Sequence, residues 1–493
     1  MAKRRGKRSR RQRRILNPHR KIQQVIEGAD FINSMPDEIL NPHREIQQVI
    51  EGADFINSMP DEILNHILSF IPIDLAIRTS VLSRRWRHAW CELPCLHLRT
   101  TAKGIDQTLL SYRRLKIMSF KLCVTHEVTE PQFNSWVEFA MSRNVGELSL
   151  TGLLFVYETY NGFPDCFYLS SSLRQLNLVG FDMRPGCTVS WNFLRRLTLS
   201  CCSLYDESIA NILSGSPNLE TLQLFYCDGL LKRLDLSKSP SLSALEIYGW
   251  SERSGQMEIV APHIHYLNLK NSDVGPCTLV DVSSLADAIL RIGLNRYRPF
   301  MAGFQQYADV LQTMVLKMLA KLQNVERLTF RGGYLLQILS LAMLCGVRLP
   351  KLKVQTLTVQ TNFARSVIPS IARLLQNSPG LKNLEVHATY VSYIEDADLD
   401  EYLRISHGLD SDTCWRSKHE VFPTHETLRF MSDCNGAKMR LLGSFLRLVL
   451  RNAKRLEKIV VWLGDSYFSD EQMERLLMVG TLSPNNNVSI EFK

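Results

Sequence analysis

The sequence predicts an α/β protein with a small helical module near the N-terminus, an irregular solenoid of repeats and an α/β C-terminal end. Two observations lead to this prediction. Short amphipathic segments crowd into residues 53–92, and leucine pairs then recur at nearly regular intervals to about residue 400. With 493 residues, the chain is long enough for about three domains or for one elongated repeat array.

The net charge of +9 comes from the N-terminus. Residues 1–14 carry nine basic side chains and no acidic one, which leaves 49 basic and 49 acidic residues in the rest of the chain. This distribution excludes a protein that coats nucleic acid with a basic surface, and the neutral body offers no basis for a nucleic-acid partner. The basic tail consists of Lys3, Arg4, Arg5, Lys7, Arg8, Arg10, Arg11, Arg13 and Arg14.

A dense basic run of this kind is typical of a nuclear import signal, which is the first interpretation of the tail. Nonspecific contact with RNA or phosphate, and a plain solubilising tail, remain open. No apolar stretch follows the tail, so we expect no secretory signal. The longest charge-free apolar run, 332–347, has 16 residues and is too short to cross a bilayer. We expect a protein of the nucleus, the cytoplasm or both, with reduced cysteines and no membrane contact.

Residues 15–40 reappear almost unchanged as residues 39–64, with Lys21 replaced by Glu45. The repeat is either a recent tandem duplication or an error in assembling the reading frame. In the first copy a proline ends the helix after one turn, and one turn is not stable alone. We therefore expect residues 15–52 to be a mobile segment with a truncated duplicate, and only the second copy to fold.

The second copy begins the helical module. Ser58 and Asp61 have a capping-box-like spacing, and Pro60 suits the first turn of a helix. Apolar residues then recur at helical spacing up to Pro72, and two further short amphipathic helices are expected at 74–80 and 81–90. So small a helical unit usually needs a partner, so its apolar surface either caps the next domain or docks another protein.

The segments 59–64, 66–72 and 76–90 resemble, in order and spacing, an F-box of the plant type, with Met59 where the family usually has Leu. The resemblance implies docking on a Skp-type adaptor, which connects to cullin and RING subunits of an SCF ubiquitin ligase. Some of the matching residues must face inward instead of toward the adaptor. By position, the adaptor-binding set is Met59, Pro60, Ile63, Leu64, Ile67, Leu68, Ile71, Pro72, Val81, Leu82 and Trp86.

Leucine pairs define the long middle of the chain, residues 93–400. Successive pairs are 21 to 29 residues apart except for one interval of 61, which we expect to hold about two irregular units and a helix near 305–322. This spacing predicts leucine-rich repeats, each with one short strand; a compact α/β domain is the alternative. The pairs are Leu148/Leu150, Leu176/Leu178, Leu197/Leu199, Leu222/Leu224, Leu245/Ile247, Leu267/Leu269, Leu328/Phe330, Leu357/Val359 and Leu384/Val386.

The turn after each strand lacks a regular Asn, since the slots hold Cys201, Tyr226 or Lys270, so we expect an irregular arc. The pair Leu234/Leu236 falls between two others and suggests an extra strand on the convex side. Residues between paired leucines point to the concave face, which is a recognition surface or a solvated face without a partner. They are Ser149, Asn177, Thr198, Gln223, Glu246, Asn268, Thr329, Thr358 and Glu385.

An acidic run at 395–401 begins a polar stretch, and we expect a solvated loop there and through 401–424, with a substrate contact as the alternative for the acidic run. Residues 425–493 predict strand, helix, strand, helix and strand, starting with a strand at 426–430. This order, with the Leu-Arg-Asn-Ala-x-x-Leu-Glu sequence of 450–457, resembles the FBD module that often ends plant F-box/leucine-rich-repeat proteins.

No catalytic constellation, cofactor motif or metal site is expected. The set His88, Cys91, Cys95 and His97 spans a junction where cysteine is more often a small buried hydrophobe than a zinc ligand. The resemblance therefore implies a non-enzymatic substrate-recognition subunit of an SCF-type ligase, which captures an unknown target protein with its repeats. The alternative is a leucine-rich-repeat scaffold or sensor that acts without ubiquitination.

Overall fold

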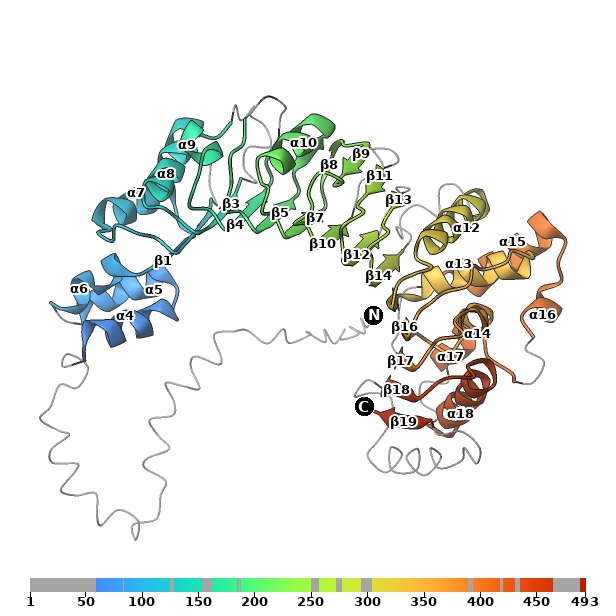
Figure 1. Ribbon diagram of the computed structural model, residues 1–493. Coiled ribbons are helices and arrows are strands. Elements are labelled where there is room, and N and C mark those ends of the chain that lie inside the picture. The colour runs from blue at the N-terminus through green and yellow to red at the C-terminus, as the bar shows by residue number, and fades with distance from the viewer. Residues whose placement is uncertain are drawn as a thin grey trace, which may run out of the picture.

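The computed structural model describes residues 59–82, 84–124, 128–152, 162–183, 186, 188–249, 257–271, 277–293, 304–388, 393–416, 420–430, 435–463 and 488–493. Within these residues, a small helical module is followed by an arc-shaped α/β solenoid (Figure 1). The predicted fold class is confirmed. The basic tail and the segment 15–52 lie outside the described residues.

The helical module holds α4 (Asp61–Ser69), α5 (Ile73–Arg78) and α6 (Trp86–Ala89), with 3₁₀ turns at Thr79–Val81 and Trp90–Glu92. Pro60 and Pro72 directly precede α4 and α5, where a missing backbone donor has no consequence. The region 81–90, expected as one helix, is broken into two short turns and α6.

A single parallel sheet lines the inner side of the arc (Figure 1). In the described part of the chain it has 14 strands, and each strand pairs in parallel with the next. The order is β1 (Cys95–Leu98), β2 (Ser119–Cys123), β3 (Glu147–Thr151), β4 (Gln175–Val179), β5 (Arg196–Ser200), β7 (Thr221–Phe225), β10 (Ala244–Tyr248), β12 (Tyr266–Asn271), β14 (Asp287–Ile292), β15 (Arg327–Arg331), β16 (Thr356–Thr361), β17 (Asn383–Ala388), β18 (Lys458–Leu463) and β19 (Ser489–Phe492).

The leucine pairs stand in register across this sheet, as the repeat spacing predicts. Leu148 lies opposite Leu176, and Leu357 lies opposite Leu384. Both members of each pair are buried because alternate residues of a strand face the same side. The interval of 61 residues holds one further strand of the sheet, β14, with Leu267 opposite Ala288 and Ala288 opposite Leu328, so it contains two irregular units as predicted. The helix expected near 305–322 is present as α12 (Phe304–Lys321).

Short strands on the outer side of the arc complete the central repeats (Figure 1). The predicted extra strand exists, because Leu234 lies in a three-stranded parallel sheet. This sheet contains β9 (Arg233–Asp235), β11 (Met257–Val260) and β13 (Cys277–Asp281). A two-stranded sheet contains β6 (Ser203–Tyr205) and β8 (Asp228–Leu230).

Helices cover the outer side of the sheet at both ends of the arc (Figure 1). The apolar run 332–347 forms α13, a buried helix that contacts its neighbours α12 and α14. No helix in the described ranges is long and apolar enough to span a membrane. These covering helices are α7 (Ala102–Ser111), α8 (Glu130–Ser142), α9 (Asp165–Tyr168), α10 (Asp206–Ser214), α12 (Phe304–Lys321), α13 (Gly333–Leu344), α14 (Ile368–Asn377) and α18 (Asn435–Asn452).

The prediction of a solvated loop from the acidic run through 401–424 is wrong. The run begins α15 (Asp396–His407), and α16 (Ser411–Cys414) follows it. Asp396, Leu399 and Leu403 share the buried face of α15. Asp396 tolerates burial because one carboxylate oxygen accepts a hydrogen bond from the backbone N–H of His425, at 2.5 Å.

The predicted strand at 426–430 is also wrong, since α17 (His425–Phe430) occupies it. The later helix and strand at 435–463 are present as α18 and β18. The second predicted helix falls within 464–487, outside the described residues. Because β18 pairs with β17 and β19 pairs with β18, this C-terminal part continues the sheet of the repeats.

Candidate docking surfaces

One side of the helical module forms a core with the first repeats. Leu64 and Leu68, one turn apart on α4, are each 1% exposed, and Trp86 is also buried. Ile73 and Ala76 of α5 join the same apolar cluster, which continues without interruption into the repeats. This packing fixes which side of α4 faces solvent.

The other side of α4 exposes a row of large apolar side chains. Ile63, Ile67 and Phe70 are 48%, 41% and 75% exposed, and their i, i+4, i+7 spacing places them on one helix face. Val81 and Leu82, which follow α5, are 88% and 63% exposed. We call these five residues the apolar docking face.

An ion pair connects the two halves of this face. The Arg85 guanidinium donates to Asp61 Oδ1 at 2.6 Å, so the chain just after Leu82 is held against the first turn of α4. Asp61 is largely exposed, and an exposed pair contributes at most about 1 kcal/mol. The pair therefore sets the relative position of the two segments more than their stability.

The eleven residues proposed from the sequence divide into three groups. Leu64, Leu68 and Trp86 are buried and support the module from inside. Met59 and Ile71 are half-buried. Pro60, Ile63, Ile67, Pro72, Val81 and Leu82 are exposed and available to a partner. Sequence reasoning missed Phe70, whose position seven residues after Ile63 is the signal that could have found it.

The concave face of the sheet carries the polar residues that lie between the paired leucines. They form a hydrogen-bonded row through the middle of the arc, in which neighbouring strands supply successive members. Thr198 Oγ1 donates to Gln223 Oε1 at 2.7 Å, and Gln223 Nε2 donates to Glu246 Oε1 at 2.9 Å. Asn268 Nδ2 donates to the other Glu246 oxygen at 3.2 Å. The Glu246 carboxylate is thus fully engaged within the protein.

The row is not polar throughout. The register places Ile289 of β14 opposite Asn268, and Val460 of β18 opposite Glu385. The sequence did not place either residue on the concave face. β14 has Ala288 where the repeat pattern requires leucine, and Val460 lies in 425–493, which was expected to be a separate module. Asn177 Nδ2 donates to Ser149 Oγ at 3.0 Å near the N-terminal end of the same row.

Aromatic and basic side chains lie at the carboxyl ends of the same strands. The Phe225 and Tyr248 ring centroids are 4.8 Å apart, and Lys270 Nζ lies 5.2 Å from the Tyr248 ring centroid. Farther along the arc, the rings of His387 and Trp462 stack with an interplanar angle of 5°. Burial lowers the pKa of His387, so the imidazole is largely neutral at neutral pH.

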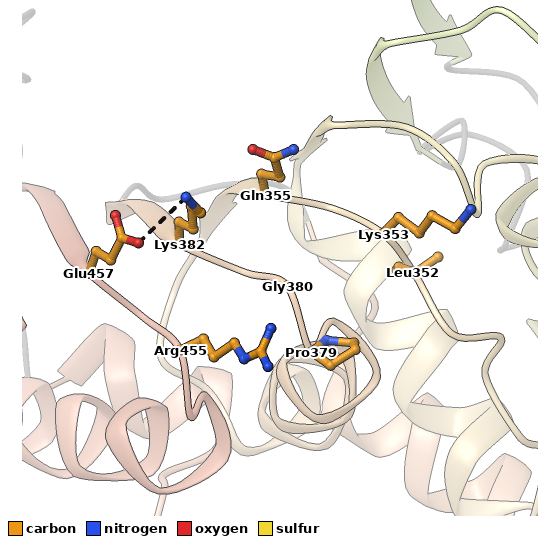
Figure 2. A pocket seen from close by; sticks show the side chains of 8 residues that line it. All are labelled: Leu352, Lys353, Gln355, Pro379, Gly380, Lys382, Arg455 and Glu457. Carbon is orange, nitrogen blue, oxygen red and sulfur yellow. Dashed lines mark ion pairs between the residues drawn. The ribbon is translucent and has the colours of Figure 1, made fainter.

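A shallow pocket lies where the chain enters β16, β17 and β18 (Figure 2). Its volume is about 710 Å³. Lys382 Nζ and Glu457 Oε1 are 3.6 Å apart across one side, and the Arg455 side chain extends toward Pro379. Its polar side chains are exposed, which makes the pocket a poor enclosure for a small molecule. Leu352, Lys353, Gln355, Pro379, Gly380, Lys382, Arg455 and Glu457 line it.

The described residues contain no group of three or more His, Cys, Asp or Glu side chains that could hold a metal ion. His88, Cys91, Cys95 and His97 do not form such a group. Burial raises the pKa of the Cys91 and Cys95 thiols, which keeps them protonated at neutral pH.

A helical module with an exposed apolar face, joined to a leucine-rich-repeat solenoid, is the architecture of F-box/leucine-rich-repeat proteins, which are typically non-catalytic adaptors. Residues 56–98 match the F-box domain family, and residues 110–387 match the leucine-rich-repeat domain family described as At1g61320/AtMIF1, LRR domain. The second match covers more than half of the chain.

Full-length relatives agree with these two domain matches. The chain is 52% identical to the Arabidopsis thaliana F-box/LRR-repeat protein At3g28410, over 100% of this chain and 99% of the relative. It is 52% identical to At5g02700 over 96% and 95%, and 46% identical to At5g02910 over 95% and 96%. The chain belongs to the plant F-box/leucine-rich-repeat family.

Proposed function

We propose that the chain is the substrate-recognition subunit of an SCF-type ubiquitin ligase. Its F-box docks on a Skp-type adaptor, through which cullin and RING subunits are recruited, and its repeats capture a target protein. The observation that supports this most directly is the apolar docking face, since large exposed apolar side chains concentrated on one helix face mark a protein interface. The chain itself supplies no chemistry.

Within this face, we assign the adaptor contact to Ile63, Ile67, Phe70, Val81 and Leu82, with Pro60 and Pro72 at its margins. Leu64, Leu68 and Trp86 hold the face in shape from the inside. Burying the exposed parts of two or three such side chains would contribute several kcal/mol, enough for a stable complex when combined with polar contacts at the rim.

Co-purification with a Skp-type adaptor tests this assignment. The double variant Ile63→Asp with Ile67→Asp should lose the adaptor, because each substitution would bury an unpaired carboxylate at the contact. The matched control is Leu110→Asp with Leu115→Asp, two residues that are 86% and 88% exposed on the repeats. Retained binding by the first variant, or equal loss by the control, would overturn the assignment.

The alternative is a repeat scaffold or sensor that binds the adaptor without ubiquitinating a partner. Adaptor binding fits both functions, so a reconstituted ligase with a captured partner must distinguish them. Ubiquitin transfer to the partner that stops with the Ile63→Asp, Ile67→Asp variant supports the ligase function. Capture without transfer would favour the scaffold.

We further propose that the basic tail, residues 1–14, directs import into the nucleus, since a dense Lys/Arg run is what an acidic import receptor binds. The protein would then act in the nucleus, the cytoplasm or both. The neutral body of the chain is left for protein recognition.

A further inference from the structure

Three basic residues stand side by side at the carboxyl ends of neighbouring strands. Lys270 of β12 lies opposite Arg291 of β14. Phe330 of β15 lies opposite Leu290 of β14, so Arg331, the next residue of β15, stands beside Arg291. All three alternate with buried residues, so they point to the concave face. We call Lys270, Arg291 and Arg331 the cationic row.

This charge has no acidic partner among the residues that the structure describes. Within the described residues none of the three cations forms an ion pair, whereas cations at the amino ends of the same sheet do. Arg327 donates to Asp287 at 2.9 Å, for example. Neighbouring strands are about 4.8 Å apart, so the three positive charges are separated by no more than about one Debye length and repel one another. An anion that covers the row would relieve this repulsion.

Two acidic groups on the neighbouring strands, Glu246 and Asp287, are already engaged with other side chains. Glu246 accepts hydrogen bonds from Gln223 and Asn268, and Asp287 pairs with Arg327. Neither of them can turn to the cationic row without breaking these contacts. Among the described residues no carboxylate is paired with the row, so the row is open to the carboxylates of another molecule.

Aromatic side chains flank the row on both sides in the same register. Tyr248 lies opposite Lys270 on one side, and its ring is supported by Phe225. Gly249, at φ +65°, leaves room for the Tyr226 ring, because a Cβ there would lie 2.4 Å from that ring. On the other side, past Gln360, are the stacked rings of His387 and Trp462, the latter 40% exposed.

We infer that the cationic row and its aromatic flanks bind an extended acidic segment of a partner protein. Two or three carboxylates lie over Lys270, Arg291 and Arg331, and an aromatic or aliphatic side chain on each side packs against Tyr248 or Trp462. The row spans about 10 Å, and the surface from Tyr248 to Trp462 crosses seven strands and spans roughly 29 Å; these lengths match about three and nine residues of extended chain. The inference rests on the proposed function, because it identifies the concave face as the substrate-binding side.

A nucleic acid is a less suitable occupant. Cations interleaved with aromatic rings also suit single-stranded nucleic acid, but such proteins offer a continuous positive groove along the backbone. Here the row has only three cations, and the Glu246 and Glu385 carboxylates lie beside it on the adjacent row of the sheet. A peptide with a few carboxylates avoids this repulsion, and its amides can hydrogen-bond to the polar residues of that row.

Display of random 12-residue peptides against the full chain tests the inference. Enriched peptides should carry two or three acidic residues beside an aromatic or aliphatic one, and their affinity should fall at least tenfold for the Lys270→Gln, Arg291→Gln, Arg331→Gln variant. The matched control removes three exposed cations elsewhere, Lys238→Gln, Lys351→Gln and Lys454→Gln, and should bind as the parent does.

Three outcomes would overturn the inference: no enrichment, enrichment without acidic residues, or equal loss with both triple variants. Stronger competition by a 12-nucleotide single-stranded DNA than by the selected peptide would assign the row to nucleic acid instead. Adaptor binding is measured on the same samples. Its absence with peptide binding retained would refute the proposed ligase function and leave this inference standing.

Discussion

Ile63 and Leu64 are consecutive residues of α4, but Ile63 faces solvent and Leu64 faces the core. Comparing their alanine variants therefore separates docking from folding. Ile63 is 48% exposed and Leu64 is 1% exposed. Leu64→Ala removes a fully buried side chain and should destabilise the module by about 2–5 kcal/mol. Ile63→Ala should change stability little, because about half of its side chain is already in water.

Ile63→Ala should instead act on adaptor binding. Burying a whole isoleucine side chain is worth about 1.5–3 kcal/mol, so the exposed half of Ile63 can add about 1 kcal/mol to adaptor affinity. Ile63→Ala should therefore raise the dissociation constant for a Skp-type adaptor roughly fivefold, as measured by titration calorimetry.

Amide hydrogen exchange of peptides covering 59–92 in the full chain measures how each substitution changes the stability of the helical module. Leu64→Ala should speed exchange about 150-fold for a loss of about 3 kcal/mol, and Ile63→Ala should leave exchange near the parent rate. The reasoning is refuted if Ile63→Ala speeds exchange as much as Leu64→Ala does, or if its adaptor affinity is unchanged.

Three further predictions concern other parts of the chain. Gln337→Leu on α13 should destabilise the C-terminal repeats by about 1–3 kcal/mol in denaturant unfolding, because it orphans the buried backbone N–H and C=O of Ile394; an unchanged midpoint would contradict this. Glu420→Gln should lower the melting temperature at pH 7, since hydrogen bonds from Arg447 hold the pKa of Glu420 below its usual 4.5. The pair's stability is present at neutral pH and is lost as the pH falls through the lowered pKa, so the variant should lose less stability on acidification below about pH 4.5; parallel pH profiles would contradict this. Deleting residues 1–14 should abolish nuclear accumulation of a fluorescent fusion, and an unchanged nuclear signal would refute the import proposal.

The repeats could be predicted from the sequence because their signal is local. In Leu148/Leu150 or Leu222/Leu224 both leucines face the core, and the two-residue period of a strand records this in the sequence. β14 escaped prediction because Ala288 stands where the pattern requires leucine, although the register is kept. Arg291 was consequently not recognised as a neighbour of Lys270.

The error at the acidic run has a different cause. Asp396 is buried because it accepts a hydrogen bond from the backbone of His425, and Asn362 Nδ2 lies 2.8 Å from His425 Nε2. These partners are 29 and 63 residues apart in the chain, so no local pattern contains them. Composition alone therefore favoured a loop where α15 forms.

The candidate docking face was predicted as a set of residues but not as a surface. Ile63 and Leu64 carry the same helical apolar pattern, and only packing against Trp86 and the first repeats determines which of them faces water. Phe70 is exposed at the end of α4 for the same reason.

Hydrogen–deuterium exchange of the full chain, with and without a Skp-type adaptor, locates the surface on which the adaptor docks. Adaptor-induced protection should be concentrated in peptides that cover α4 and the 79–82 segment, with the concave face of the repeats unchanged. Protection located on the repeats, or no protection at saturating adaptor, would show that the F-box does not dock in this way.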